Sequence, residues 1–204
     1  MSQVTNHGEK SGFLPQFRSI ALVAVGSNLP SRVGQPLQTI HSAVSRMSAS
    51  GLLIRNQSAY FQTPCFPAGI GPDYVNGAFV IESDHSAPKI LEILHQIETE
   101  FDRAREQRWG QRTLDLDLLA LDDLITPDAD TVQKWIDLEV DIQKIRAPDE
   151  LILPHPRMQD RAFVLVPLMD VAPDWVHPVL KRSVREMHDA LPKQDKDAVK
   201  RLVN

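Results

Sequence analysis

The sequence predicts an α+β fold, in which helices cover an antiparallel-rich sheet, because three kinds of signal recur along the chain. Residues 19–25 form an apolar, β-prone run, which is typical of a buried strand. Apolar residues recur at helical spacing in the segments 35–47 and 86–101. Residues 113–121 instead alternate leucine with aspartate, the period of a strand with one polar face.

The first half of the chain supplies a strand, a helix and two further strands. Residues 1–18 lack any hydrophobic period, so we expect a flexible N-terminal arm. The first strand breaks at Gly26, and the helix follows over residues 35–47. Two more strands are expected over residues 52–61 and 74–82, joined by a loop whose prolines and glycines exclude regular structure.

The second half begins with a helix that Ser86 and Pro88 open and that should end near Arg105. The alternating strand follows, which gives the order strand, helix, strand, strand, helix, strand. This order is that of a ferredoxin-like split βαββαβ sheet with its helices on one face.

The remaining residues add an insertion and a C-terminal helix to this unit. Residues 126–148 are charged but carry apolar residues near helical spacing, which makes an added helix plausible. A short apolar segment, 164–169, leads to a final helix that Ser183 and Glu186 open as a capping box. We expect one domain over residues 19–192 and a charged tail over residues 193–204.

Composition excludes several classes of protein. The chain has 204 residues and a formal net charge of -5, so no overall basic field indicates a nucleic-acid partner. No stretch has the length of a membrane span, and the N-terminus lacks the apolar region of a signal peptide. Because a single cysteine, Cys65, cannot form an internal disulfide, we expect a cytoplasmic protein, and we expect it to be monomeric.

Two carboxylates share one face of the alternating strand. Asp115 and Asp117 are two residues apart, so their side chains project from the same face about 7 Å apart at the Cα atoms. Magnesium favours such oxygen ligands and usually takes one or two carboxylates, with water and phosphate oxygens in the other positions. The alternative is an edge strand whose solvent face is merely acidic.

Arginines are concentrated immediately before this strand, where Arg103, Arg105, Arg108 and Arg112 accompany Trp109. Guanidinium groups suit phosphate oxygens, and together with magnesium they describe a triphosphate site. Cations at a helix C-terminus could also account for the first two arginines. A P-loop motif is absent from the sequence, so side chains and metal ions would hold the nucleotide.

Five short segments resemble the 6-hydroxymethyl-7,8-dihydropterin pyrophosphokinase family of folate biosynthesis. Two of them are specific, namely R-W-G-Q-R-T-L-D-L-D at residues 108–117 and L-P-H-P-R-M-Q-D-R-A-F at residues 153–163. The others are G-S-N-L at 26–29, Y-F-Q-T-P at 60–64 and P-D-Y-V-N at 72–76. The resemblance implies transfer of diphosphate from ATP to the hydroxymethyl group of the pterin, with release of AMP.

The resemblance also implies roles for individual residues. Asp115 and Asp117 would hold two magnesium ions, and Arg103, Trp109 and Arg112 would join them as catalytic residues. The nucleotide would be bound by Glu98, Arg103, Arg105, Arg112, His155 and Arg161. The pterin would lie between Tyr74 and Phe163, with its edges recognised by Asn76 and by groups near Thr63, Pro64 and Phe66.

Some features depart from the family pattern or allow other interpretations. His95 stands where members commonly have glutamine, Asp102 stands where glycine is frequent, and the 126–148 segment is longer than in compact members. A binding module that has lost catalysis and a magnesium-dependent phosphohydrolase are therefore the alternative functions. By base rate, Tyr74 and Phe163 could equally be core residues.

Overall fold

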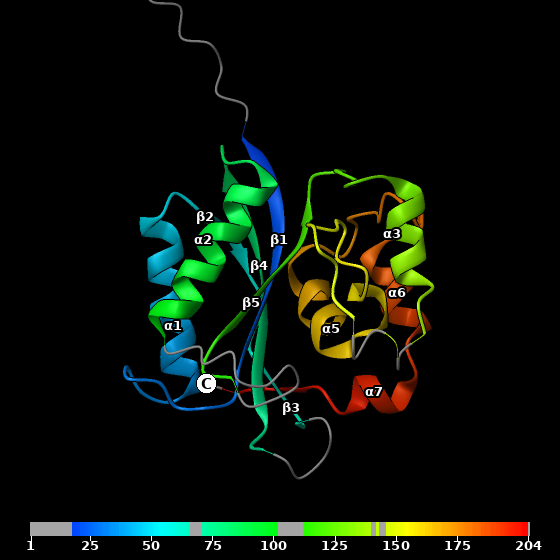
Figure 1. The fold of residues 1–204 in the computed structure, drawn as a ribbon. Coiled ribbons are helices and arrows are strands. Elements are labelled where there is room, and N and C mark those ends of the chain that lie inside the picture. Colours follow the sequence, from blue (N-terminus) through cyan, green and yellow to red (C-terminus); the bar gives the residue numbers. More distant parts are fainter. Residues whose placement is uncertain (1–17, 66–70, 102–111, 140–141, 143–145, 204) are drawn as a thin grey trace, which may run out of the picture.

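An antiparallel sheet forms the centre of the molecule, and helices cover both of its faces (Figure 1). The computed structural model describes residues 18–65, 71–101, 112–139, 142 and 146–203. The elements of the N-terminal half are β1 (Ser19–Ser27), α1 (Pro36–Ala49), β2 (Leu53–Gln57), β3 (Phe61–Thr63), β4 (Tyr74–Ser83) and α2 (Ala87–Glu100). Those of the C-terminal half are β5 (Asp115–Leu121), α3 (Ala129–Ile136), a 3-10 turn (Met158–Asp160), α5 (Ala162–Val171), α6 (Val184–Ala190), α7 (Lys193–Asp197) and β6 (Lys200–Arg201).

The strand order is β5-β1-β4-β3-β6, and β2 pairs with β4 beside β3. Each of these pairs is antiparallel. The two longest strands, β1 and β4, pair along their whole length from Ser19 opposite Ser83 to Ser27 opposite Val75. Strand β5 lies on the other side of β1, so the predicted acidic strand is at one edge of the sheet.

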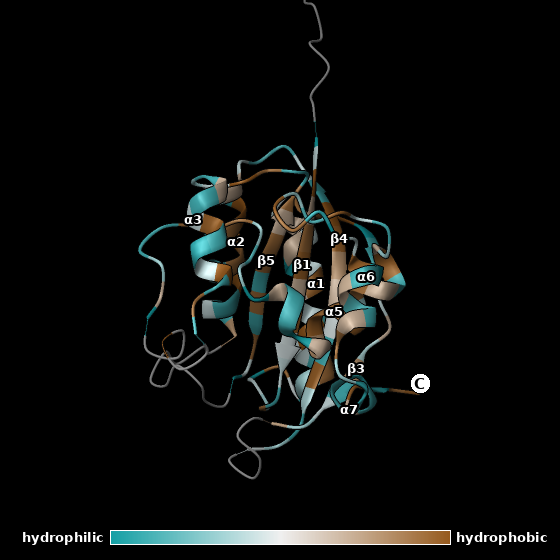
Figure 2. Cartoon of the chain, turned by 90° about the vertical axis from the view of Figure 1, so that its right-hand side faces the viewer, coloured by the Kyte–Doolittle hydropathy of each residue, from teal (hydrophilic) through white to brown (hydrophobic). Residues whose placement is uncertain are grey.

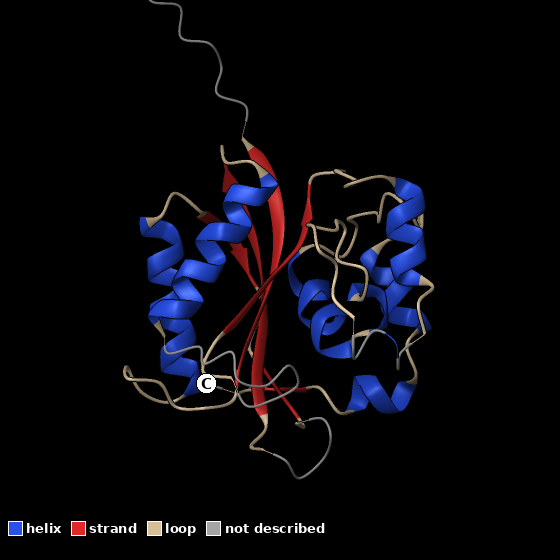
Figure 3. Ribbon diagram, viewed as in Figure 1, coloured by secondary structure: helices blue, strands red, loops and turns tan. Residues whose placement is uncertain are grey.

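Alternation along β1 sends successive side chains into two different cores. Val23 packs with α1 and α2 in one cluster, which includes Ile40 and Leu94. Its neighbour Leu22 packs on the opposite face with α5, in a cluster that includes Leu165. The two helices of the predicted unit, α1 and α2, therefore share one face, as predicted. Helix α5 adds a layer on the other face that the sequence did not predict, and Figure 3 shows the strands between two layers of helices.

The sequence did not predict the second helical layer, because its main helix, α5, is apolar at all but one of its positions and has no polar face. Residues 164–169, expected as a short apolar segment, belong to α5. Periodicity cannot distinguish such a run from a buried strand, and Figure 2 shows α5 as largely hydrophobic beside the sheet. The next helix, α6, begins as predicted, since Ser183 and Glu186 form a capping box.

The strand expected over residues 52–61 is divided into β2 and β3. Between them, the backbone N–H of Ser58 donates to the carbonyl of Ala78 at 3.0 Å. The Ser58 hydroxyl in turn accepts from the Ala78 N–H at 2.9 Å. A side chain thus replaces one backbone partner of β4, and the ladder is interrupted there.

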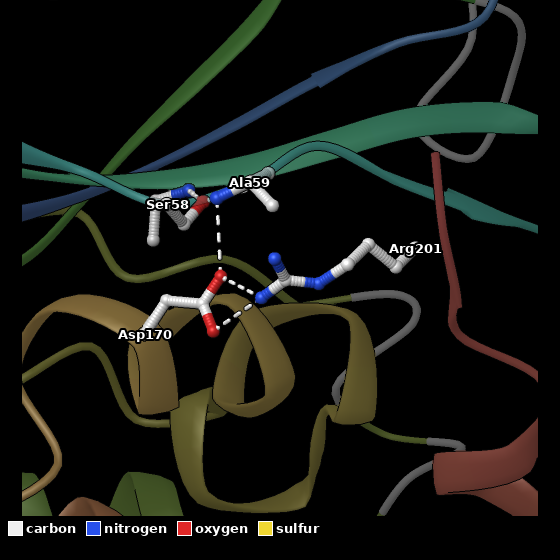
Figure 4. Close-up of polar contacts among 5 residues, drawn as sticks. Ser58, Ala59, Asp170 and Arg201 are labelled. Carbon is white, nitrogen blue, oxygen red and sulfur yellow. Dashed lines mark hydrogen bonds and ion pairs between the residues drawn. The ribbon is translucent and has the colours of Figure 1, made fainter. Parts of the chain in front are cut away.

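The C-terminal segment, expected as a charged tail, contributes α7 and the short strand β6, which pairs with β3. A carboxylate on α5 ties this strand to the sheet (Figure 4). Asp170 accepts two bonds from the Arg201 guanidinium, at 2.8 and 2.7 Å. It also accepts from the backbone N–H of Ala59 at 3.1 Å.

In the insertion, α3 begins at the Asp128 cap, whose side chain accepts from the Thr131 N–H. This helix ends at Ile136, so it covers only the first part of the expected helical pattern. For α2, the described helix ends at Glu100, and the expected continuation to Arg105 lies outside the described residues. None of the described helices is long and apolar enough to cross a bilayer.

Candidate active site

A cavity of about 880 Å³ opens beside the ends of β1, β4 and β5. It is lined by ten of the residues that the sequence singled out, which come from separate parts of the chain. These are Thr63, Pro64, Tyr74, Asn76, Arg112, Asp115, Asp117, His155, Arg161 and Phe163. The fold therefore brings the predicted acidic, basic and aromatic groups to one place.

The sheet register explains why the acidic and amide side chains meet there. Gly26 of β1 lies opposite Asn76 of β4 on one side and opposite Asp115 of β5 on the other. A β-carbon added at Gly26 would lie 3.0 Å from Oδ1 of Asn76 and 3.7 Å from the Tyr74 ring. The contact with the Tyr74 ring would be an ordinary one, but the β-carbon would crowd the Asn76 amide, so glycine at this position keeps the amide unhindered at the cavity wall.

Asp115 and Asp117 occupy the same face of β5, as predicted. Leu114, Leu116 and Leu118 are buried in the first core, whereas both aspartates are half-buried and line the cavity. Each carboxylate faces an arginine: Asp115 forms an ion pair with Arg112, and Asp117 lies 3.8 Å from Nη1 of Arg161. The carboxylates therefore belong to a charged cluster inside the cavity and are not the solvent face of an edge strand.

The two arginines respond differently to this environment. Burial is the largest single influence on Arg112 and lowers its pKa, but Asp115, together with Asp117 and Tyr74, outweighs burial, and the pKa is raised. For Arg161, burial lowers the pKa, and Asp117 offsets that effect only in part. Both side chains remain cationic at neutral pH, because a guanidinium is not deprotonated in proteins.

His155 is held in the neutral form beside these cations. Burial is the main cause that lowers its pKa to about 3, and the nearby charge of Arg161 is the second. Its backbone N–H donates to the carbonyl of Leu119 at 2.8 Å, which fixes the loop against β5. Its ring Nδ1 accepts from the Arg157 N–H at 3.1 Å, so Nε2 carries the proton and is a donor.

The opposite end of the cavity is a polar and aromatic pocket. Asn76 is 5% exposed, and its amide donates to the Thr63 hydroxyl at 2.6 Å. Tyr74 is half-buried, and burial raises the pKa of its hydroxyl. Phe163 is 40% exposed at the cavity wall, with the Arg161 guanidinium 5.7 Å from its ring centroid. Neither ring is fully buried and both line the cavity, which is the position that stacking on a flat ligand requires.

Glu98 occupies a different position from the one predicted. It is 1% exposed, does not line the cavity, and accepts a hydrogen bond from the backbone N–H of Leu116 at 2.8 Å. That N–H lies between the two aspartates on the free edge of β5. Glu98 thus supports the strand that carries the two aspartates, and its side chain does not line the cavity.

Four predicted site residues, Phe66, Arg103, Arg105 and Trp109, lie outside the described residues. Asp102, which departs from the family pattern, also lies there. The predictions for these positions therefore remain predictions. His95 is described, and it lines the cavity from α2.

Asn28 is a site residue that the sequence analysis quoted only as part of a landmark motif. It is 2% exposed, and its Oδ1 accepts from the Arg112 N–H at 2.8 Å. Its Nδ2 donates to the Pro72 carbonyl at 3.0 Å and lies 4.0 Å from the Cys65 sulfur. One buried amide therefore joins the arginine of the acidic cluster to both flanks of the 66–70 segment. The tight turn after β1 was the only signal for it.

The insertion also contributes to the cavity, which the sequence left undecided. Trp135 of α3 and the described residues 146–152 are among the lining residues. The guanidinium carbon of Arg146 lies 5.8 Å from the Trp135 ring centroid. The insertion therefore covers part of the site and is more than a surface decoration.

The two carboxylates in the cavity suit a hard cation that takes most of its ligands from water and from phosphate oxygens. Within the described part of the chain, no group of three or more histidine, cysteine, aspartate or glutamate side chains could hold a metal ion. The pair Asp115 and Asp117 is a two-carboxylate set without nitrogen or sulfur ligands. This set fits magnesium, which retains water and takes phosphate oxygens, and it does not fit a structural zinc site.

Comparisons with known sequences match this chain to the same kind of enzyme. The family model described as 7,8-dihydro-6-hydroxymethylpterin-pyrophosphokinase (HPPK) matches residues 22–173. A Synechocystis 2-amino-4-hydroxy-6-hydroxymethyldihydropteridine pyrophosphokinase is 34% identical over 174 residues, which cover 85% of this chain and 76% of the relative. A Haemophilus influenzae protein of the same name is 35% identical, and the match covers 83% of this chain and 93% of the relative.

Among solved structures, Plasmodium falciparum HPPK-DHPS has a similar fold. The TM-score is 0.57 at 15% identity, and the match covers 84% of this chain and 43% of that chain. This chain therefore spans less than half of that longer protein. At this identity the likeness concerns the fold, and it agrees with a mixed sheet-and-helix architecture.

Proposed function

The chain belongs to the 7,8-dihydro-6-hydroxymethylpterin-pyrophosphokinase family, and from that premise we propose how its cavity divides the reaction between its residues. The protein is a pyrophosphokinase of folate biosynthesis. It transfers diphosphate from ATP to the hydroxymethyl group of 6-hydroxymethyl-7,8-dihydropterin and releases AMP.

One observation carries the assignment of roles: the two aspartates of β5 line the same cavity as Tyr74, Asn76 and Phe163. A reaction between a triphosphate and a planar alcohol needs both partners within one water-excluding space. The row Asn76, Gly26 and Asp115 across three strands supports an acceptor site directly beside the phosphate site.

The acceptor pterin lies between the rings of Tyr74 and Phe163 in this proposal. Planar heterocycles stack on aromatic faces, and both rings are at the cavity wall. The Asn76 carboxamide and the Thr63 hydroxyl supply donor and acceptor atoms to the edge of the ring system. Their mutual hydrogen bond of 2.6 Å supports a preset orientation of the amide.

Asp115 and Asp117 would hold magnesium, and two ions are proposed. When bound, magnesium neutralises phosphate charge and stabilises the charge that develops during transfer. Arg112, Arg161 and the Nε2–H of His155 provide further donors toward phosphate oxygens. Because each arginine already faces an aspartate, a bound nucleotide would exchange these ion pairs for phosphate contacts.

No protein group is assigned as general base. Phosphoryl-type transfer depends mainly on positioning and charge stabilisation, and the charged groups of the cavity are suited to both. His155 is neutral, but its Nδ1 is engaged by the Arg157 N–H, so its free nitrogen is a donor. The pterin hydroxyl therefore attacks in line without a dedicated side-chain base.

The finer architectural predictions are also proposed here. The strand order β5-β1-β4 with β2 and β3 beyond supports a ferredoxin-like core sheet. Both hydrophobic clusters contact this one sheet, which supports a single domain. Because β6 pairs with β3, this domain extends past the expected limit at residue 192 and includes Arg201. From the sequence, we also propose a cytoplasmic monomer that acts on small molecules.

The reaction is tested by incubating the wild-type protein with ATP and MgCl2, with and without 6-hydroxymethyl-7,8-dihydropterin, and by measuring AMP and phosphate by chromatography. AMP that appears only with the pterin is expected. Phosphate release without the pterin would instead identify a phosphohydrolase. ATP binding in calorimetry without any product would identify a module that has lost catalysis.

A further inference from the structure

The insertion contributes part of the cavity lining. Its described lining residues are Trp135 of α3 and residues 146–148, and the lining continues through residues 149–152 and through Leu91 and His95 of α2. None of these residues belongs to the acidic strand or to the pocket around Asn76. They form a separate wall whose chemistry the roles assigned above do not use.

Backbone hydrogen bonds place the insertion beside the edge strand β5. Strand β5 is the last strand on its side, and the His155 N–H donates to the Leu119 carbonyl beyond it. Thr126 and Leu153 exchange both of their backbone hydrogen bonds at 3.0 Å, which closes the insertion at its base. The insertion thus lies outside β5, while Asn76 lies two strands away on β4, about 10 Å across the sheet.

The reaction requires one orientation of a nucleoside triphosphate in this cavity, with its terminal phosphates toward the acceptor. Its terminal phosphates have to reach the aspartates and the acceptor beside them, because the bond that forms involves the β-phosphorus. The nucleoside then extends away from the acceptor, past the edge of β5. The described residues that it meets there are those of the insertion wall.

The wall has the chemistry that recognises a heteroaromatic base. Trp135 is half-buried, and the Arg146 guanidinium carbon lies 5.8 Å from its ring centroid. A tryptophan face stacks on any purine, and a planar guanidinium stacks as well while it donates hydrogen bonds to a ribose or an α-phosphate. Arg146 is exposed, so it can move off the ring without leaving a buried charge unpaired.

We propose that the insertion is a nucleoside-binding wall, in which Trp135 stacks on the base of ATP and Arg146 closes over it. The proposal rests on the assigned pyrophosphokinase reaction. The simpler role for the pair is a cation–π contact that only holds the insertion together. The two roles differ in which ligands they affect.

The test compares Trp135→Ala and Arg146→Ala with Lys134→Ala, a matched control on the same helix that is exposed and does not line the cavity. We expect Trp135→Ala to raise KM for ATP about tenfold, with KM for the pterin and kcat at saturating ATP unchanged. Trp135→Phe should restore most of the affinity, and Arg146→Ala should show a smaller rise. Thermal unfolding of each variant shows whether the fold is retained.

Inorganic tripolyphosphate provides a ligand with the phosphates but no base. Calorimetry should show that Trp135→Ala weakens binding of non-hydrolysable α,β-methylene-ATP while tripolyphosphate binding stays the same. Equal losses for both ligands, or unchanged ATP analogue binding in Trp135→Ala and Arg146→Ala, would overturn the proposal. Absence of pterin-dependent AMP in the wild type would instead overturn the assigned reaction, so the two failures are distinct.

Discussion

The two ends of the cavity are held in different ways. At the acceptor end, Asn76 and Thr63 sit on paired strands, are buried, and are joined by a side-chain hydrogen bond. At the far end, Trp135 is half-buried and Arg146 is exposed, and both belong to an insertion outside the sheet. The acceptor end is therefore part of the core architecture, whereas the far end is an addition to it.

This difference predicts two kinds of mutational response. A buried polar group that loses its partner costs about 1–3 kcal/mol, whereas exposed groups cost little. Changes around Asn28 and Asn76 should therefore lower both stability and activity. Changes at Arg146 should lower nucleotide affinity and leave the free energy of unfolding nearly unchanged.

The largest effect is expected between the two ends, at the acidic strand. Asp117→Ala removes one of two proposed magnesium ligands, and kcat/KM should fall by more than about a hundredfold, since loss of residues that only orient metal ligands costs ten- to a hundredfold. The fold should persist, because Asp117 is half-buried and its neighbours Leu116 and Leu118 retain their core contacts. Steady-state kinetics and thermal unfolding measure the two quantities.

Asp123→Ala is the control, since Asp123 is an exposed residue just beyond the same strand. It should have wild-type activity. A metal-dependent Asp117→Ala enzyme with near wild-type turnover would refute the role of this aspartate.

Acid should destabilise the protein through two histidines, His177, which is buried, and His155, which is half-buried in the cavity wall. Burial lowers the pKa of His155 to about 3 and that of His177 to about 4. Because the unfolded chain binds these protons near pH 6.5, it holds more protons than the folded chain below that pH. Stability is therefore fully present above about pH 6.5 and falls as the pH is lowered toward 4, by up to about 3 kcal/mol for His177.

His177 is remote from the proposed chemistry, so it provides a clean test. Its Nδ1 accepts from the N–H groups of Val179 and Leu180, at 3.2 and 3.1 Å. His177→Asn keeps a side-chain acceptor but does not titrate, so its free energy of unfolding should depend less on pH between 6.5 and 4. Urea denaturation at a series of pH values measures this slope. An unchanged slope would contradict the assignment.

Substitution of Asn28 should lower both stability and activity, by less than Asp117→Ala lowers activity. Asn28→Leu leaves the Arg112 N–H and the Pro72 carbonyl without their side-chain partner, and should cost about 1–3 kcal/mol of stability. Because it also removes one of the hydrogen bonds that hold the Arg112 backbone, kcat should fall more than pterin affinity does, as we expect for Arg112→Ala. Kinetics with varied pterin separate kcat from KM.

Asn28→Asp is the matched variant, because it keeps the acceptor for the Arg112 N–H and loses the donor to Pro72. It should retain more of kcat than Asn28→Leu, while KM for the pterin rises. Equal kcat and KM effects in both variants would mean that Asn28 acts only through overall stability.

The sequence predicted the parts of the site that depend on local pattern. Alternation placed Asp115 and Asp117 on one face of a strand, because leucines on the other face must be buried. Asn28 was not predicted, since its partners are backbone groups that folding brings together from residues 72 and 112. The contact of Glu98 with the Leu116 N–H was missed for the same reason, while its proposed role toward the nucleotide stays a prediction.

The fold, like the site, was predicted where it depends on local sequence pattern and missed where it depends on contacts between distant residues. Helices and strands with a clear period were predicted within a few residues, including α1 and β4. The second helical layer was not, because α5 has no polar face to give a period. The break between β2 and β3 was also missed, since it depends on the contact of the Ser58 side chain with Ala78.

The smallest effect is expected at the outer edge of the acceptor end, where β6 covers β3. Arg201→Ala removes an ion pair with Asp170 whose partners are 58% and 28% exposed, so it should cost at most about 1 kcal/mol and lower Tm by about 2–4 °C. Because β3 carries Thr63, KM for the pterin should rise by less than about threefold while KM for ATP stays constant. Lys200→Ala keeps the strand pairing and should change neither constant. A rise in KM for ATP in Arg201→Ala would show that the two ends of the cavity are coupled, against the separation inferred from their construction.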